Sequence, residues 1–214
     1  MTVPTKRALV AGGAALLLAL GLGLTVTLRR APLGADAAWL REVTEHRSEF
    51  WLVPSLVMNF LGGGWFGTIL VPVAVTVLLV VVKQPWHALY FLVASAASAA
   101  LVQLLKATFG RVRPADILVH VDAGSFPSGH VANAATIAVA LGFILRRTWA
   151  WVAGVVYVVL MALSRTYLGA HWLSDTIGGA LLGAAVAVLV WALLAHKLGL
   201  PPWHSGHSTD SVEP

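Results

Sequence analysis

The sequence contains no cysteine and few charged residues, and both shortages narrow the possible classes of protein. The absence of cysteine from all 214 residues excludes disulfides, thiol catalysis and cysteine-based metal sites. Charged residues make up 11% of the chain and hydrophobic residues 58%, whereas a soluble domain carries roughly 25% charged residues. So few polar side chains cannot cover the surface of a soluble fold. The composition therefore predicts an integral membrane protein and excludes a disordered or ordinary cytosolic one.

The charge that is present is mostly basic, and the net charge is +5. In a soluble protein this excess would suggest nucleic-acid binding. In a membrane protein, Lys and Arg gather at the ends of spanning helices, where topology and anionic lipids favour them. We therefore expect membrane lipids, and no nucleic acid, as partners, while the oligomeric state stays open.

Long apolar segments predict an all-α, polytopic membrane fold. A spanning helix needs about 20 mostly apolar residues. Six such segments occur, roughly at residues 8–28, 66–82, 86–105, 129–145, 149–168 and 173–195. A cleaved signal peptide is the alternative for the first segment, but its apolar run is longer than the roughly 7–15 residues of a signal peptide. We expect one six-helix domain over residues 1–197 and a flexible tail over residues 198–214.

A more polar stretch, residues 31–64, separates the first two apolar segments. Trp39, Val43, His46 and Phe50 recur in it at helical spacing, with charged residues mostly on other faces. This pattern predicts a short amphipathic helix lying at the membrane interface. A solvated connector is the alternative, and the three glycines at residues 62–64 end the pattern.

The distribution of Lys and Arg bears on the orientation of the chain in the cell membrane. With both termini cytoplasmic, six cations fall on the inner side (Lys6, Arg7, Lys83, Arg146, Arg147 and Lys197) and the other eight of the 14 on the outer side. This count opposes the positive-inside rule. The conflict weakens if some of the outer cations bind a ligand. We therefore expect both termini to be cytoplasmic and the functional site to face outside.

Three short motifs hold most of the ionisable groups of the last four apolar segments. They are Lys106-x6-Arg113-Pro114, Pro127-Ser128-Gly129-His130 and Ser164-Arg165-x5-His171-x3-Asp175. Each motif lies at the end of an apolar segment, and with six spanning helices all three lie on the same membrane face. Each residue alone has an ordinary structural explanation, but their combination in a chain so poor in charge indicates a functional site.

The first chemistry that these motifs indicate is the binding of an anion. Lys106, Arg113 and Arg165 are three cations that would repel one another without an anion between them. Arginine binds phosphate oxygens in a bidentate manner, and lysine adds a point charge. Ser128 and Gly129 lie where a helix begins, and a helix N-terminus offers free N–H groups to an anion. The residues therefore predict a site for a phosphate-like group.

The second chemistry is phosphoryl transfer. His171 and Asp175 are four residues apart and would lie on one helical face. The carboxylate would then hold one imidazole nitrogen and leave the other free to attack phosphorus. His130 is a second histidine, able to protonate the leaving oxygen.

Together the three motifs resemble the signature of the type 2 phosphatidic acid phosphatase superfamily, which contains membrane lipid phosphatases, soluble acid phosphatases and vanadium haloperoxidases. The resemblance covers residues 106–175 and departs from the signature at no position. It implies a phosphohistidine formed on His171, with Asp175 orienting the imidazole and His130 protonating the leaving group. It further implies that Lys106, Arg113, Ser128, Gly129 and Arg165 hold the phosphoryl oxygens, without a metal or other cofactor.

The expected function is hydrolysis of a phosphomonoester or terminal pyrophosphate on a lipid. Undecaprenyl diphosphate, or another prenyl diphosphate, is slightly favoured over phosphatidic acid and phosphatidylglycerophosphate, by analogy with the family and not from residues. The alternatives are a non-enzymatic phospholipid binder or transporter and a vanadate-dependent haloperoxidase. Four polar residues between the first two motifs are expected to form a solvated loop, with control of substrate choice as the alternative: Arg111, Asp116, His120 and Asp122.

Overall fold

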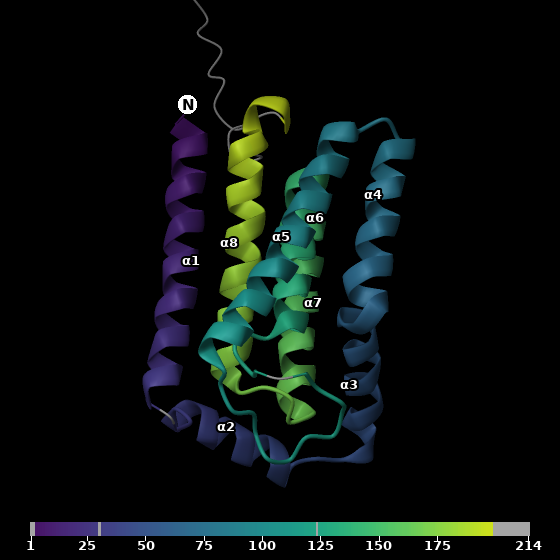
Figure 1. The fold of residues 1–214 in the computed structure, drawn as a ribbon. Coiled ribbons are helices and arrows are strands. Elements are labelled where there is room, and N and C mark those ends of the chain that lie inside the picture. Colours follow the sequence, from purple (N-terminus) through teal and green to yellow (C-terminus); the bar gives the residue numbers. More distant parts are fainter. Residues whose placement is uncertain (1–2, 30, 123, 199–214) are drawn as a thin grey trace, which may run out of the picture.

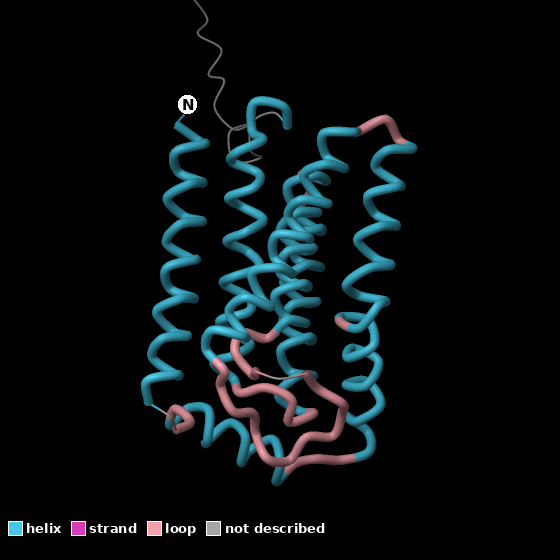
Figure 2. Tube along the Cα trace, in the orientation of Figure 1, coloured by secondary structure: helices cyan, strands magenta, loops and turns pink. Residues whose placement is uncertain are grey.

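The computed structural model describes residues 3–29, 31–122 and 124–198, and within these ranges the chain forms helices and loops without a strand (Figure 1; Figure 2). The expected flexible tail lies outside the described residues, apart from residue 198. The elements are α1 (Val3–Arg29), α2 (Gly34–Glu45), α3 (Glu49–Gly62), the π-helix η1 (Phe66–Leu70), α4 (Val71–Val81), α5 (Pro85–Phe109), α6 (Gly129–Leu145), α7 (Thr148–Tyr167) and α8 (Leu173–Leu198).

The long helices run side by side, and the chain crosses the bundle from end to end (Figure 1). The start of α1, the α4–α5 turn, the α6–α7 turn and the end of α8 lie at one end of the bundle. Helix α2 lies across the other end, together with the loop between α5 and α6 and the turn between α7 and α8. We call this the α2 end. All three motifs lie at this end of the bundle, and their position on one membrane face stays a prediction.

The outer faces of the bundle are those of a membrane protein. On α7, Val152, Val155, Val156 and Val159 are each about half exposed or more and form one apolar stripe. Among the described residues, four helices are long and apolar enough to cross a membrane: α1, α5, α7 and α8. Helix α3 with η1 and α4 makes a fifth candidate, bent by 44°. Helix α6 is apolar but has only 17 residues. Six spanning helices therefore remain a prediction.

The polar stretch before the second apolar segment differs from the sequence-based expectation. An amphipathic helix does follow α1, but α2 ends at Glu45, so Phe50 does not share a helix with Trp39 and Val43. Phe50 belongs instead to α3, where Phe50, Trp51 and Val53 are exposed apolar side chains. The expected boundary was wrong because α3 is an apolar helix that joins the second candidate span. Whether α2 lies at the membrane interface stays a prediction.

Small residues bring α6 and α8 into close contact. A Cβ atom at Gly179 would meet the backbone of Ser128, and one at Gly183 would meet the backbone of Ala132, so both positions require glycine. The Thr136 hydroxyl of α6 lies 3.2 Å from the Gly183 carbonyl of α8. The backbone N–H of Ser128 donates to the Asp175 carbonyl over 3.0 Å. The start of α6 is thereby fixed against the start of α8, and the second motif against the third.

The three consecutive glycines interrupt the second candidate span between α3 and η1. Gly64 has a φ of 55°, in the left-handed region that favours glycine. Across the break, Asn133 of α6 donates to the carbonyl of Gly67 over 2.8 Å. The break places the last turn of α3 against the first turn of α6, where His130 lies.

Candidate active site

The three motifs surround one cavity at the α2 end. It has a volume of about 400 Å³. Six of the eight expected site residues line it: Lys106, Arg113, Gly129, His130, Arg165 and His171. The other two, Ser128 and Asp175, are fully buried behind the wall. Further into the bundle, the cavity is lined by neutral polar side chains that include Ser95, Ser98 and Asn133.

The three cations of the site come from three different elements. Lys106 lies in the last turn of α5 and is 7% exposed, Arg113 lies in the α5–α6 loop, and Arg165 lies near the end of α7 and is 2% exposed. Arg113 is held by the carbonyls of Gly124 at 2.9 Å and Ala170 at 2.5 Å. The Nε atom of Arg165 is buried and has no hydrogen-bond partner among the described residues. These cations converge on one cavity, as expected for an anion site.

Asp122 provides the anion that two of these cations contact. Its carboxylate oxygens lie 2.7 and 2.9 Å from the Lys106 Nζ atom, and one of them lies 2.8 Å from the Arg113 Nη2 atom. Partial burial alone would raise the pKa of Asp122, but the hydrogen bond and charge of Lys106, together with Arg113, hold it below its ordinary value. Asp122 is therefore an ionised group that already contacts Lys106 and Arg113.

His171 and Asp175 form the pair that their spacing predicts. The His171 Nδ1 atom lies 3.5 Å from the Asp175 Oδ2 atom, and among the described residues it has no partner at hydrogen-bonding geometry. The His171 Nε2 atom is 3.3 Å from the Arg113 Nη1 atom on the cavity side. Asp175 Oδ2 also accepts a hydrogen bond from the Trp172 N–H over 2.9 Å. A proton on Nδ1, facing the carboxylate, leaves the Nε2 lone pair toward the cavity.

His171 is neutral at physiological pH. Burial lowers the pKa of His171 to about 4. Asp175 opposes this shift, and the charges of Arg165 and Arg113 add to it. A neutral imidazole has the free electron pair that a nucleophile needs.

His130 lies in the first turn of α6 beside the glycine break. Its Nε2 atom is 3.1 Å from the backbone carbonyl oxygen of Asn59, in the last turn of α3. The last carbonyls of a helix have no partner within the helix, so this one is free to accept from the imidazole. The Asn59 side-chain oxygen also accepts from Arg165. Asn59 therefore contacts both His130 and Arg165, and sequence analysis missed it because an asparagine in an apolar segment has no motif around it.

The loop between α5 and α6 differs from the solvated loop expected from the sequence. Arg111 is 8% exposed and forms ion pairs with Asp36 and Asp175, so a solvated side chain was wrong for it. His120 lines the cavity, and Asp122 contacts Lys106. Asp116 is exposed, and its carbonyl accepts a hydrogen bond from Arg47. Asp36 was also missed, because nothing in the sequence relates α2 to the motifs.

The described residues form a helical membrane bundle with one cavity lined by three cations. The cavity is also lined by the histidine of the buried His–Asp pair and by a second histidine. These features define a membrane protein that binds and processes an anion at one end of its helices. The chain belongs to the PAP2 superfamily, whose profile matches residues 87–198. The chain is 30% identical to phosphatidylglycerophosphatase B of Bacillus subtilis over 166 residues, which cover 71% of this chain and 74% of that protein. It is 42% identical to an undecaprenyl-diphosphatase of Sulfolobus acidocaldarius over 65 residues, covering 30% of this chain and 31% of that one.

Its fold is similar to the crystal structure of a transmembrane PAP2-type phosphatidylglycerolphosphate phosphatase from Bacillus subtilis. The TM-score is 0.76 at 26% sequence identity, covering 88% of this chain and 97% of that one. The similarity extends beyond the motif region to most of the bundle. It therefore includes helices that the family profile does not match.

Proposed function

We propose that this protein is a membrane-embedded lipid phosphatase that hydrolyses a phosphomonoester or terminal pyrophosphate through a phosphohistidine on His171. The observation that carries the proposal is the position of His171. Its Nε2 atom faces a cavity lined by Lys106, Arg113 and Arg165, with Asp175 buried behind the ring. The relatives include phosphatases of a glycerophospholipid and of a prenyl diphosphate, so the reaction class has support from both.

In the first proposed step, the His171 Nε2 lone pair attacks phosphorus and the bond to the leaving oxygen breaks. The Nδ1 proton stays on His171, and Asp175 stabilises the cationic ring that forms. His130 protonates the leaving oxygen, which departs as the lipid alcohol, or as the lipid monophosphate when a diphosphate is the substrate. A water molecule then attacks phosphorus and gives a proton to the now neutral His130. The phosphorus–nitrogen bond breaks, its electron pair returns to the His171 Nε2 atom, and inorganic phosphate is released.

The cations are proposed to stabilise charge on the phosphoryl oxygens during both steps. Arg165 is suited to this role because its Nε donor is buried and unpaired among the described residues. Gly129 begins α6 at the cavity wall, where a helix N-terminus contributes backbone N–H groups. Ser128 is proposed to act from behind the wall through its backbone, because its N–H donates to the Asp175 carbonyl and so fixes the start of that helix against α8, whereas its side chain caps nothing. Since three side-chain cations supply the positive charge, the proposed reaction needs no metal ion.

The site is proposed to face outside, with the termini in the cytoplasm. At the α2 end, Arg111 is paired with carboxylates, and Lys106, Arg113 and Arg165 point into the cavity. These four cations do not act as free topology signals, which removes the conflict with the positive-inside rule. A lipid in the outer leaflet would then reach the cavity by lateral diffusion.

Phosphate release from lipids tests the proposal. Purified protein in detergent should release phosphate in the presence of EDTA from one or more of undecaprenyl diphosphate, phosphatidic acid and phosphatidylglycerophosphate. His171→Ala should abolish turnover while binding of the lipid persists. The wild type should form an acid-labile phosphoenzyme, and His171→Ala should form none. Complete dependence on an added divalent metal, or ordinary activity of His171→Ala, would reject the mechanism.

A further inference from the structure

A buried cluster of charges connects α2 to the His171–Asp175 pair. Asp36, in the first turn of α2, is 1% exposed. Besides the nearby N–H of Leu33 at 3.4 Å, it accepts hydrogen bonds from three groups elsewhere in the chain. These are the Ser174 N–H at 2.8 Å, the Ser174 hydroxyl at 2.7 Å and the Arg111 Nη2 atom at 2.7 Å. A carboxylate without exposure is costly unless it is paired, and here the partners come from the start of α8 and from the α5–α6 loop.

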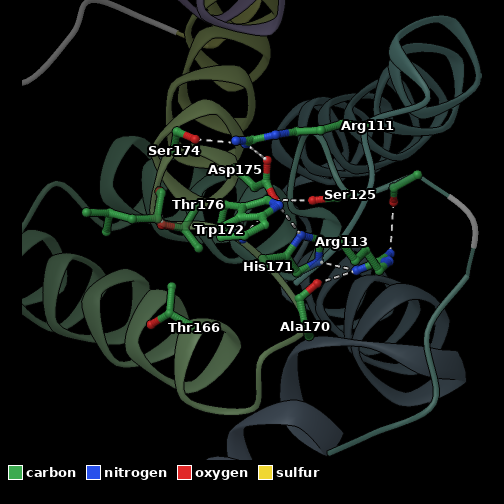
Figure 3. A network of polar contacts seen from close by, with 12 residues as sticks. Arg111, Arg113, Ser125, Thr166, Ala170, His171, Trp172, Ser174, Asp175 and Thr176 are labelled. Carbon is green, nitrogen blue, oxygen red and sulfur yellow. Dashed lines mark hydrogen bonds and ion pairs between the residues drawn. The ribbon is translucent and has the colours of Figure 1, made fainter. Parts of the chain in front are cut away.

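Arg111 bridges two carboxylates that are far apart in the sequence. Its Nη2 atom contacts Asp36. Its Nη1 atom donates to Ser174 over 2.8 Å and to Asp175 (Figure 3). The guanidinium carbon also lies 5.6 Å from the centre of the Trp172 ring. The planar fork of arginine suits this bridging, which a lysine cannot reproduce. One buried cation is thus shared between Asp36 and the carboxylate that faces His171.

Stability alone does not account for this cluster. Replacing buried ion pairs by apolar side chains is often neutral or stabilising, because desolvation offsets the attraction. Asp36 also lies outside residues 87–198, the part of the chain that the family profile matches. The cluster ends on Asp175, which lies behind His171. Its position therefore points to the reaction more than to the fold.

We propose that Asp36 and Arg111 are positioning residues that set the orientation and effective charge of Asp175, and through it the basicity of the His171 nucleophile. This inference rests on the proposed function. Arg111 occupies Oδ1 of Asp175, while Oδ2, which also accepts hydrogen bonds from the Ser125 hydroxyl and the Trp172 N–H, faces the imidazole. Arg111 also offsets the charge of Asp175, so that the carboxylate does not keep a second proton on His171. Asp36 in turn holds Arg111 in place and offsets part of its positive charge.

The other charged groups around His171 stay constant when these two residues change. Arg113 of the α5–α6 loop and Arg165 of α7 disfavour a second proton on the imidazole, and Asp175 of α8 favours one. Lys106 of α5, His130 of α6 and Asp122 of the same loop also lie around the cavity. Variants at Asp36 and Arg111 leave all six groups in place, so a change in basicity would come from the buried cluster.

The pH dependence of kcat/KM tests the proposal, because its acid limb follows the loss of neutral His171 in the free enzyme. Arg111→Gln removes a cation near Asp175, which favours the protonated imidazole and should move the acid limb up by about one pH unit. Asp36→Asn removes an anion and should move the limb down. Both variants should lower kcat about tenfold or more, since the pair is less well oriented. Opposite shifts of the limb are a result that general loosening of the site does not produce.

Two further variants keep the test decisive if Arg111→Gln does not fold. Arg111→Lys keeps the charge and should have an acid limb closer to that of the wild type, although kcat falls. The double variant Asp36→Asn with Arg111→Gln removes one charge of each sign and should return the limb toward the wild-type position. Shifts of the same sign in Asp36→Asn and Arg111→Gln, a double-variant limb no closer to the wild-type position than that of Asp36→Asn, or unmoved limbs in all variants, would show a merely structural cluster. A wild type without lipid phosphate hydrolysis would instead reject the proposed function itself.

Discussion

The Asp122 carboxylate lies 2.7 Å from the Lys106 ammonium group, and the same oxygen is 2.8 Å from Arg113. A side chain of the protein thus sits on two of the three cations that we assign to phosphate binding. The carboxylate is about half exposed, at 55%, and belongs to the loop between α5 and α6. It is therefore free to leave when a phosphate with more negative charge arrives.

Asp122→Asn should strengthen the binding of phosphate. Removing the carboxylate frees Lys106 and Arg113 from a competing anion, and a partly exposed ion pair is worth up to about 1 kcal/mol. We expect KM for the lipid substrate and the inhibition constant for inorganic phosphate each to fall about two- to fivefold. Asp116→Asn is the matched control, since Asp116 is an exposed carboxylate of the same loop. A higher KM in Asp122→Asn would mean that Asp122 orients the cations and does not compete with phosphate.

The activity of the wild type should persist at mildly acidic pH. Because burial lowers the pKa of His171 to about 4, the nucleophile stays neutral from neutral pH down to about pH 5. An unperturbed histidine, with a pKa of roughly 6.5, would already lose activity below neutrality. Activity is lost as the pH falls through the lowered pKa, so the acid limb of kcat/KM should lie near pH 4. A limb at or above pH 6 would contradict the environment that we describe for His171.

Gly63→Ala should impair the reaction without unfolding the protein. A Cβ atom at Gly63 would run into the His130 ring, which must then leave the Asn59 carbonyl. Displacing a catalytic group by about 1 Å can cost about 100-fold, so we expect kcat to fall about 10- to 100-fold while the melting temperature changes little. Gly21→Ala on α1 is the control, because nothing lies within 4 Å of the added atom. Equal kcat values for the two variants would count against His130 as the group that protonates the leaving oxygen.

The orientation in the membrane has a direct test. A reporter inserted after Arg147, in the turn between α6 and α7, should read as cytoplasmic. A second reporter between α2 and α3, at the opposite end of the bundle, should read as external. This pair serves as its own control, since the two turns lie at different ends (Figure 1). The reverse readings would place the cavity in the cytoplasm and the substrate in the inner leaflet.

Much of the fold and the centre of the site could be predicted from the sequence, because both depend on local patterns. Apolar segment length placed α6 at residues 129–145, which are its bounds in the structure. The spacing between His171 and Asp175 predicted their contact because four residues make about one helical turn. Converging charges in an apolar chain likewise indicated one cavity for Lys106, Arg113 and Arg165.

The remaining parts depend on contacts between distant segments. Arg111 and Asp36 are 75 residues apart in the sequence, and no periodicity relates them. Asn59 contacts His130 through a backbone carbonyl, which any residue type could supply. The break after α3 was visible as three glycines, but the sequence does not say that the bend presses α3 against α6. Such details require the packing of the helices.

The neighbourhood of α1 and α8 has a consequence for biosynthesis. Gly12 of α1 packs against Leu189 of α8, and Asp36 just beyond α1 binds the start of α8. Because α1 precedes α8 in the chain, α1 finds this partner only when α8 has been made, after all the helices between them. His171 and Asp175 are also among the last residues of the site to be translated. The His171–Asp175 pair and the packing of α1 against α8 therefore form together, so that a nascent chain would acquire activity only once α8 is in place.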